Sequence, residues 1–337
     1  MKSFLSAVCL IPALYAEHTA PVFRTETRVV TVDVMIRDLK TRLPIGDLSL
    51  ENFKLRIDGK DRQVSYFGHG GEDRRPLAML VFFNLAPEGG LRELANRAAM
   101  SSFAAALQQL SPQDEVAVYA ARDWFVGEAK EIIALTRDRN AAAQAMQRSV
   151  ELAIGTSETD RQSERLSKEK MMSAAVQRAV ELSDIRPDSQ VALVYVSDGM
   201  NTLDTMEAKD RRALAETLQA RNISFSALNL NMLSSYAAAA SVINPLGMVF
   251  GLSVTGASTY LAKQVGGVSV EVPSAGQLGA ALEQVVSCYA SRYLLGYQVS
   301  ESEYRDGRRH RIEVKLEGTK GKRLEVSWRK GFLASRD

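Results

Sequence analysis

An acidic residue follows an apolar, strand-like stretch late in the chain. Residues 191–197 read VALVYVS, and Asp198-Gly199 and a polar loop come next. A carboxylate at the end of a buried strand can bind a hard cation such as magnesium, which prefers oxygen ligands. It can also end the strand and accept hydrogen bonds from backbone amides, as aspartate does in turns. Both roles are open for Asp198 from these residues alone.

Motifs for zinc, acyl transfer and phosphate binding are absent. The second glycine of GLSVTG, residues 251–256, comes one residue too late for the nucleophile motif G-x-S-x-G. GHGGEDRR at 68–75 lacks the Gly-Lys-Ser/Thr ending of a phosphate-binding loop. The three histidines are dispersed and form no helical metal pair: His18, His69 and His310.

Catalysis would need an acid and a base within one crevice. Glu88 and Asp198 are the one such pair that we can name, and three scattered histidines make a Ser/His/Asp catalyst hard to build. We therefore predict that the protein is not an enzyme.

Strand and helix patterns alternate through the middle of the chain, residues 76–292. PLAMLVFF at 76–83 is a continuous apolar run, which is typical of a strand buried on both faces of a parallel sheet. Repeated βα units predict an α/β domain with a doubly wound, mostly parallel, Rossmann-like sheet. Further strands are expected at 114–121, 131–136, 191–197, 222–230 and 268–272, and helices at 91–110, 138–151, 164–183, 205–220, 258–265 and 275–292.

Both ends of the chain have β patterns. Residues 27–37 alternate apolar and polar side chains, and residues 52–68 predict a hairpin that turns at Asp58-Gly59 and returns through Val64, Tyr66 and Phe67. Three short β-patterned segments follow residue 292. Because isolated hairpins are only marginally stable, we predict that 22–70 and 293–332 pack together as a small β-sandwich-like module.

The first sixteen residues have the pattern of a signal peptide. One cation precedes an apolar stretch that ends in a small residue at Ala16, and Pro12 argues against a buried helix instead. We therefore expect export, to the periplasm, the cell surface or the medium. Cys9 would leave with the signal and Cys288 would remain alone, so no intrachain disulfide is expected.

Charge and composition limit the kinds of partner. Lys and Arg number 42 against 40 Asp and Glu, and this balance argues against nucleic acid or a membrane surface as a partner. Residues 305–330 are locally basic, with ten Lys and Arg; we interpret them as a solvated strand face, with an anion-binding patch as the alternative.

Residues 222–262 contain no charged residue and no histidine. Asn244, Pro245 and several serines argue against a membrane span there, so no span is expected after removal of the signal. Two interpretations stay open: a loop or short helix packed on the rim of the domain, or an exposed apolar lip at 230–252 that meets a partner.

The motifs of the chain occur in a characteristic order. RDLKTRLPIGDLSLENFKLRIDGKDRQVSYF at 37–67 precedes PLAMLVFFNLAPEGG, LQQLSPQDEVAVYAA and the strand that ends at Asp198-Gly199. SRYLLGYQVS at 291–300 and WRKGF at 328–332 follow. This order resembles a von Willebrand factor type A (VWA) domain and, more narrowly, the bacterial VWFA-related domain proteins, over nearly everything after the signal.

The resemblance implies a divalent cation at the carboxyl edge of the sheet. The family holds it in a metal-ion-dependent adhesion site with an Asp-x-Ser-x-Ser triplet, a Thr from a second loop and an Asp from a third. Asp198 matches the third-loop Asp, but Asn84, Ala86 and Glu88 occupy the triplet positions and Glu169 the Thr position. We therefore expect a degenerate site without metal or another cofactor. A rearranged magnesium, calcium or manganese site of Asn84, Glu88, Glu169 and Asp198 is the alternative.

Taken together, these patterns predict an exported, non-enzymatic protein–protein interaction module with an unidentified protein partner; the oligomeric state is left open. In a doubly wound sheet the functional crevice lies at the carboxyl ends of the strands. The loops at 84–90 and 198–206 belong there and are the expected contact surface. The alternative is a metal-dependent adhesion module. The expected contact residues are Asn84, Pro87, Glu88, Asp198, Met200 and Asn201.

Overall fold

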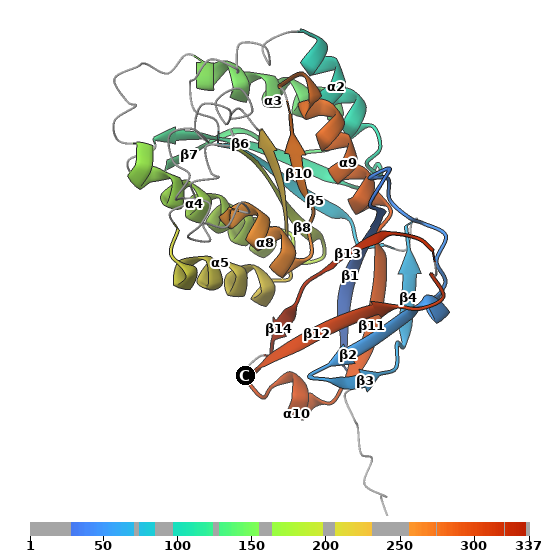
Figure 1. The fold of residues 1–337 in the computed structure, drawn as a ribbon. Helices are drawn as coiled ribbons and strands as arrows, with labels where there is room; N and C mark the ends of the chain where they lie inside the picture. Colours follow the sequence, from blue (N-terminus) through green and yellow to red (C-terminus); the bar gives the residue numbers. More distant parts are fainter. Residues whose placement is uncertain are drawn as a thin grey trace, which may run out of the picture.

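The chain forms an α/β domain and a smaller β module that adjoin each other (Figure 1). The structure, a computed structural model, describes residues 28–70, 74–84, 97–123, 128–154, 164–197, 206–230, 256–273, 275–319 and 321–334. Among the helices within these ranges, none combines the length and the apolar character that a bilayer crossing requires.

The α/β domain is built on a six-stranded sheet with the order β10-β9-β8-β5-β6-β7. All side chains of β5, β8 and β9 are buried, as their continuous apolar sequences predict for strands covered on both faces. One edge strand, β7 (Glu128–Thr136), is antiparallel to its neighbour. The other five strands run parallel: β5 (Leu77–Asn84), β6 (Glu115–Asp123), β8 (Gln190–Ser197), β9 (Ser224–Leu230) and β10 (Ser269–Val272).

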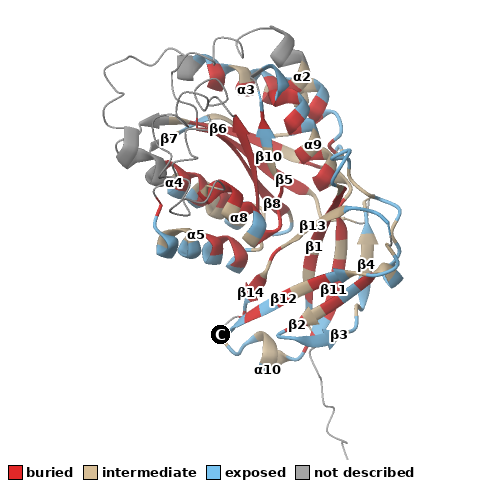
Figure 2. Cartoon of the chain, in the orientation of Figure 1, coloured by how far each residue is buried: buried red, intermediate tan, exposed pale blue. Residues whose placement is uncertain are grey.

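Helices cover both faces of this sheet, and buried residues gather between the layers (Figure 2). Alternate side chains of β5 point to opposite faces of the sheet. Met79 and Val81 lie in one core, and Leu80 and Phe82 lie in the other. The doubly wound sheet is therefore confirmed. The first face packs against α2 (Arg97–Leu107), α3 (Arg139–Ile154) and α9 (Leu278–Ala290), and the second against α4 (Glu164–Ile185), α5 (Ala208–Ala220) and α8 (Ala257–Val265).

The β module combines both ends of the chain in two four-stranded sheets, with the orders β13-β1-β11-β4 and β14-β12-β2-β3. β1 pairs with β11 and β13, and β2 pairs with β12, all antiparallel, so the predicted joining of the chain ends is confirmed. The strands are β1 (Arg28–Asp38), β2 (Phe53–Ile57), β3 (Lys60–Arg62), β4 (Tyr66–His69), β11 (Tyr293–Val299), β12 (Arg309–Leu316), β13 (Leu324–Trp328) and β14 (Gly331–Leu333). Short helices lie at Leu50–Asn52 (η1), Ala275–Gln277 (η4) and Glu301–Tyr304 (α10).

The predicted hairpin at 52–68 is only partly correct. The Asp58-Gly59 turn is present, with positive φ angles of 49° and 78°, but the returning strand β3 ends at Arg62. The chain then crosses to the other sheet, where β4 pairs with β11. Phe67 therefore packs across the module against Phe53, with ring centroids 5.6 Å apart. An alternating pattern does not distinguish which of two packed sheets a strand joins.

A buried histidine of β12 is hydrogen-bonded to carboxylates in two turns of the module. His310 is 5% exposed, and its Nδ1 and Nε2 lie 2.8 Å from Asp58 Oδ2 and 3.2 Å from Asp306 Oδ1. Because carboxylates accept hydrogen bonds, both contacts are satisfied together when both ring nitrogens carry a proton, as in the imidazolium. Burial lowers the pKa of His310, but the hydrogen bonds to both carboxylates outweigh it and raise the pKa above its usual value.

This arrangement predicts a loss of stability above neutral pH. The raised pKa of His310 contributes stability that is complete below its unfolded value of about 6.5 and is lost as pH rises through the folded value. The lowered pKa values of Asp58 and Asp306 act only at acid pH. Urea unfolding at about pH 6 and pH 8 should show a larger fall in stability for the wild type than for His310→Gln. Equal falls would show that the imidazolium does not stabilise the module.

Candidate functional site

Four neighbouring strands of the α/β sheet carry polar side chains at or next to their carboxyl ends, and these side chains share one register row. Asn84 of β5 lies opposite Ser197 of β8, Ser197 opposite Asn229 of β9, and Asn229 opposite Glu271 of β10. Register partners of parallel strands point to the same face, here the one covered by α4, α5 and α8. We call these four residues the polar row.

Asn229 is the centre of a hydrogen-bond network in this row. Its Oδ1 accepts from Ser258 Oγ at 3.0 Å and from Ser197 Oγ at 3.4 Å. Its Nδ2 lies 3.4 Å from Thr259 Oγ1 and 3.3 Å from Glu271 Oε1. Asn229 is 7% exposed, so these bonds tie the ends of three strands to the first turn of α8 in a buried setting.

Asn84 lies at the point where the order of strand addition in the sheet reverses. From β5 the chain continues to β6 on one side, and β8 lies on the other, so Asn84 and Ser197 flank the topological switch point where doubly wound sheets bind ligands. The Asn84 side chain is buried and donates from Nδ2 to the Tyr195 hydroxyl. Within the described part of the chain its Oδ1 is buried and accepts no hydrogen bond.

Asn84 is the one predicted site residue whose side chain the structure describes. Glu169 belongs to α4, but its side chain is not among those described. The signal segment and residues 231–252 are outside the described residues as well. So are Pro87, Glu88, Asp198, Met200 and Asn201.

The described part of this edge offers few ligands for a divalent cation. No group of three or more His, Cys, Asp or Glu side chains in the described ranges is placed to hold a metal ion. At the switch point itself, the possible metal ligands among the described residues are the amide oxygen of Asn84 and the hydroxyl of Ser197. Magnesium and calcium need six or more oxygen ligands, commonly with carboxylates. These two residues do not fit a cation by themselves.

The polar row beyond Asn84 was not identified from the sequence. A signal for it was present, because the apolar runs of β5 and β8 each finish in a polar residue, Asn84 and Ser197. Asn229 and Glu271 stand one residue before the ends of β9 and β10, so only the register brings them into the row.

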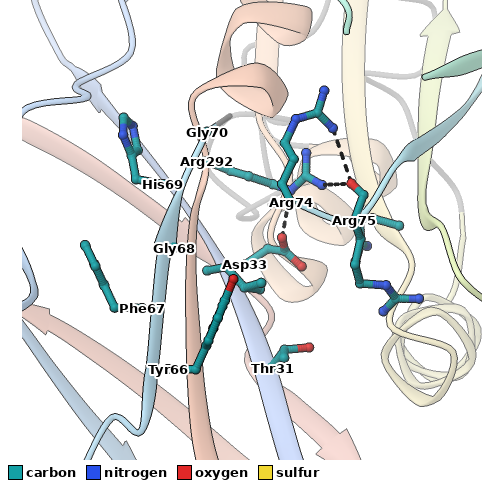
Figure 3. A pocket seen from close by; sticks show the side chains of 12 residues that line it. Thr31, Asp33, Tyr66, Phe67, Gly68, His69, Gly70, Arg74, Arg75 and Arg292 are labelled. Carbon is teal, nitrogen blue, oxygen red and sulfur yellow. Dashed lines mark hydrogen bonds and ion pairs between the residues drawn. The ribbon is translucent and has the colours of Figure 1, made fainter. Parts of the chain in front are cut away.

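A second candidate is a cleft of about 270 Å³ where the β module meets the α/β domain (Figure 3). Strands β1 and β4 of the module supply Asp33, Tyr66 and His69. The segment before β5 supplies Arg75, and the short connection between α9 and β11 supplies Arg292. A cluster of cations in a cleft suggests an anion site, so the partners of these arginines decide its role.

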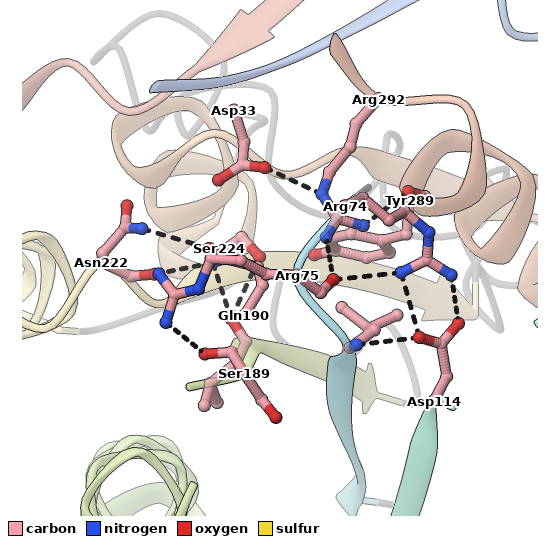
Figure 4. A network of polar contacts seen from close by, with 12 residues as sticks. Asp33, Arg74, Arg75, Asp114, Ser189, Gln190, Asn222, Ser224, Tyr289 and Arg292 are labelled. Carbon is pink, nitrogen blue, oxygen red and sulfur yellow. Dashed lines mark hydrogen bonds and ion pairs between the residues drawn. The ribbon is translucent and has the colours of Figure 1, made fainter. Parts of the chain in front are cut away.

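These arginines already donate to acceptors of the protein (Figure 4). Arg292 Nε lies 2.8 Å from Asp33 Oδ1, and Arg292 also donates to the Tyr289 carbonyl at 2.8 Å. Arg75 donates to the carbonyls of residues 187 and 189 at 2.7 and 3.0 Å. Arg74 binds Asp114. The cleft is therefore a structural junction between the two parts of the molecule.

Cys288 lies on the buried face of α9 and forms no disulfide within the described residues. Burial raises the pKa of its thiol to about 11. The nucleophilic form of cysteine is the thiolate. At neutral pH Cys288 is therefore a packing residue.

Comparisons with known proteins give low similarity. No protein-family model and no curated protein sequence matches the chain. Among solved structures, it is similar to a von Willebrand factor type A from Catenulispora acidiphila, with 9% identity, a TM-score of 0.41, and coverage of 85% of this chain and 74% of that one. It is similar to the TFIIH p34 N-terminal domain, with 12% identity, a TM-score of 0.37, and coverage of 62% and 97%.

It is also similar to the manganese-loaded TRAP protein of Plasmodium vivax, with 10% identity, a TM-score of 0.35, and coverage of 80% and 98%. No residue role and no ligand is transferred from these weak likenesses. The chain has a doubly wound, mixed α/β fold, as predicted, and this rests on its own strand order and its two helical layers.

Proposed function

We propose that the protein is an exported, non-enzymatic protein–protein interaction module that binds its partner at the carboxyl edge of the α/β sheet. The observation that supports this most directly is the buried Oδ1 of Asn84, which accepts no hydrogen bond within the described residues. A buried acceptor without a donor costs about 1–3 kcal/mol. A donor from an adjoining loop or from a partner seated at this edge would recover that free energy.

The polar row also fixes where the contact loops begin. Asn84 and Ser197 are register partners on adjacent strands, so the last residues of β5 and β8 lie side by side, about 5 Å apart. The proposed contact residues are Asn84 itself and the loop residues Pro87, Glu88, Asp198, Met200 and Asn201. The signal-like first sixteen residues support export.

The module is proposed to work without a bound metal ion. One observation favours the alternative of a metal-dependent adhesion module. The Oδ1 of Asn84, which accepts no hydrogen bond within the described residues, is a hard neutral ligand of the kind that magnesium and calcium accept. Glu88, Glu169 and Asp198 would have to supply the carboxylates of that site.

Titration with metal ions separates the two functions. We expect the full chain to give no binding heat with magnesium, calcium or manganese at up to millimolar concentration, and no rise in Tm. Micromolar binding that disappears in both Asp198→Ala and Asn84→Ala would show the metal-dependent module instead. Thr319→Ala, in a turn of the β module, is the control and should behave as the wild type in either case.

A further inference from the structure

A cleft of about 560 Å³ opens in the β module beside the last turn of α8. It is a separate surface from the polar row, because α8 begins at that row and reaches the cleft with Gln264 near its opposite end. We call it the basic cleft. Arg309, Arg311, Ile312, Glu313, Trp328 and Lys330 line it.

Lys330 presents an ammonium group to this cleft without a carboxylate partner in the described part of the chain. Its Nζ lies 2.9 Å from the centroid of the Trp328 ring, a cation–π contact. The side chain is half-buried, and burial lowers the pKa of Lys330 to about 8. A desolvated cation is stabilised by a nearby anion, and the aromatic ring replaces only part of that interaction. The position therefore favours an incoming carboxylate.

Hydrogen bonds on both sides of Lys330 fix its backbone. Its N–H donates to the Gln264 carbonyl at 2.8 Å, and its carbonyl accepts from the Ile312 N–H at 3.0 Å. Trp328 Nε1 donates to the Ile312 carbonyl, also at 3.0 Å. The ring and the ammonium are thus positioned before any ligand arrives, which reduces the entropic cost of binding.

Two further cations lie on the same exposed face of β12. Arg309 and Arg311 are both exposed and lie two residues apart, so their Cα atoms are about 6.8 Å apart along the strand. Arg311 pairs with Glu313 at 3.2 Å and Arg309 with Glu216 at 3.3 Å. Arg309 also donates a neutral-acceptor hydrogen bond to Gln219 Oε1 at 2.8 Å. Such exposed ion pairs are worth about 0–1 kcal/mol. Both guanidinium groups can therefore exchange these partners for a ligand carboxylate.

We propose that the basic cleft binds an extended acidic peptide segment. In an extended peptide, alternate side chains point the same way at the spacing of Arg309 and Arg311. Two carboxylates at alternate positions therefore meet these two arginines, and a third reaches Lys330 above Trp328. The cleft carries three cations against one carboxylate, Glu313. Its volume is within the range of small-ligand sites, which is enough for the few side chains of a peptide that enter it.

The fluorescence of Trp328 can report peptide binding directly, because the chain contains only one other tryptophan, Trp124. In a Trp124→Phe background, the blocked peptide Glu-Ser-Glu-Ser-Glu should change the fluorescence of Trp328 saturably. Lys330→Gln should weaken binding about tenfold, the loss of one charge-assisted contact. Lys322→Gln is the matched control, since Lys322 is exposed, pairs with Asp47 at 3.2 Å and lies outside the cleft. It should bind as the wild type does.

Arg311→Gln provides a second variant that does not depend on a buried side chain, and it should weaken binding several-fold. No saturable change at millimolar peptide, or full affinity in both Lys330→Gln and Arg311→Gln, would overturn the proposal. Equal affinity for citrate, for inorganic phosphate or for the Gln-Ser-Gln-Ser-Gln peptide would show that the cleft does not select an acidic peptide.

Discussion

Asp114→Ala should lower the free energy of unfolding by about 3–5 kcal/mol, the usual cost of removing one partner of a buried ion pair. The Asp114 carboxylate is fully buried and accepts from Arg74 Nη1 at 3.0 Å, from the Leu77 N–H at 2.8 Å and from the Ser111 N–H at 2.9 Å. Without it, the nearly buried Arg74 guanidinium and two backbone N–H groups lose their acceptor.

Urea unfolding followed by far-UV circular dichroism measures this loss. Asp138→Ala is the matched control, because Asp138 also accepts two backbone N–H bonds, from Asn140 at 2.9 Å and Ala141 at 3.0 Å, but at an exposed helix start. It should cost about 1 kcal/mol. Equal losses in the two variants would show that the buried carboxylate contributes no more than an exposed cap.

Arg292→Met should destabilise the protein by a similar amount, about 3–5 kcal/mol. Arg292 is 3% exposed and joins three elements at the junction (Figure 4). It pairs with Asp33 of β1 and donates to the carbonyls of Tyr289 in α9 and, at 3.2 Å, of Arg75 before β5. Methionine fills similar space but leaves Asp33 without its cation.

A double-mutant cycle with Asp33→Asn tests this assignment. The double variant should lose clearly less than the sum of the two single losses, because the second change removes the charge that the first leaves unpaired. Arg178→Met is the control: its pair with Glu181 is about 40% exposed on both sides and should contribute about 0–1 kcal/mol. Additive losses at Asp33 and Arg292 would mean that the two side chains act independently.

The fold was largely predictable because hydrophobic periodicity carries most of the required information. The apolar runs of β5 and β8 are long enough to require burial on both faces, and most of the segments between the strands have apolar residues at helical spacing. The path of residues 64–69 was not predictable in the same way. Their alternating pattern fits either sheet of the module, and the choice depends on packing across its core, as with Phe67 against Phe53.

The candidate site was predictable only in part. The resemblance directed attention to Asn84, which lies at the switch point of the sheet. The rest of the polar row depends on strand register, which short local patterns do not specify. The basic run at 305–330 was interpreted as a solvated face, yet Arg329 is 9% exposed and Lys330 is half-buried. Their burial follows from the packing of β13 against α8 and of β14 against α5, which are tertiary contacts.

The central claim is that the carboxyl edge of the sheet binds a protein partner without a metal ion. The most direct test is capture of a partner from an envelope extract by the immobilised full chain in the presence of a chelator. We expect the wild type to retain its partner, and Pro87→Asp combined with Met200→Asp to lose it. Leu43→Asp, at a residue 61% exposed on the β module, should retain it. Loss of the partner from the wild type on chelation, restored by magnesium, would contradict the account.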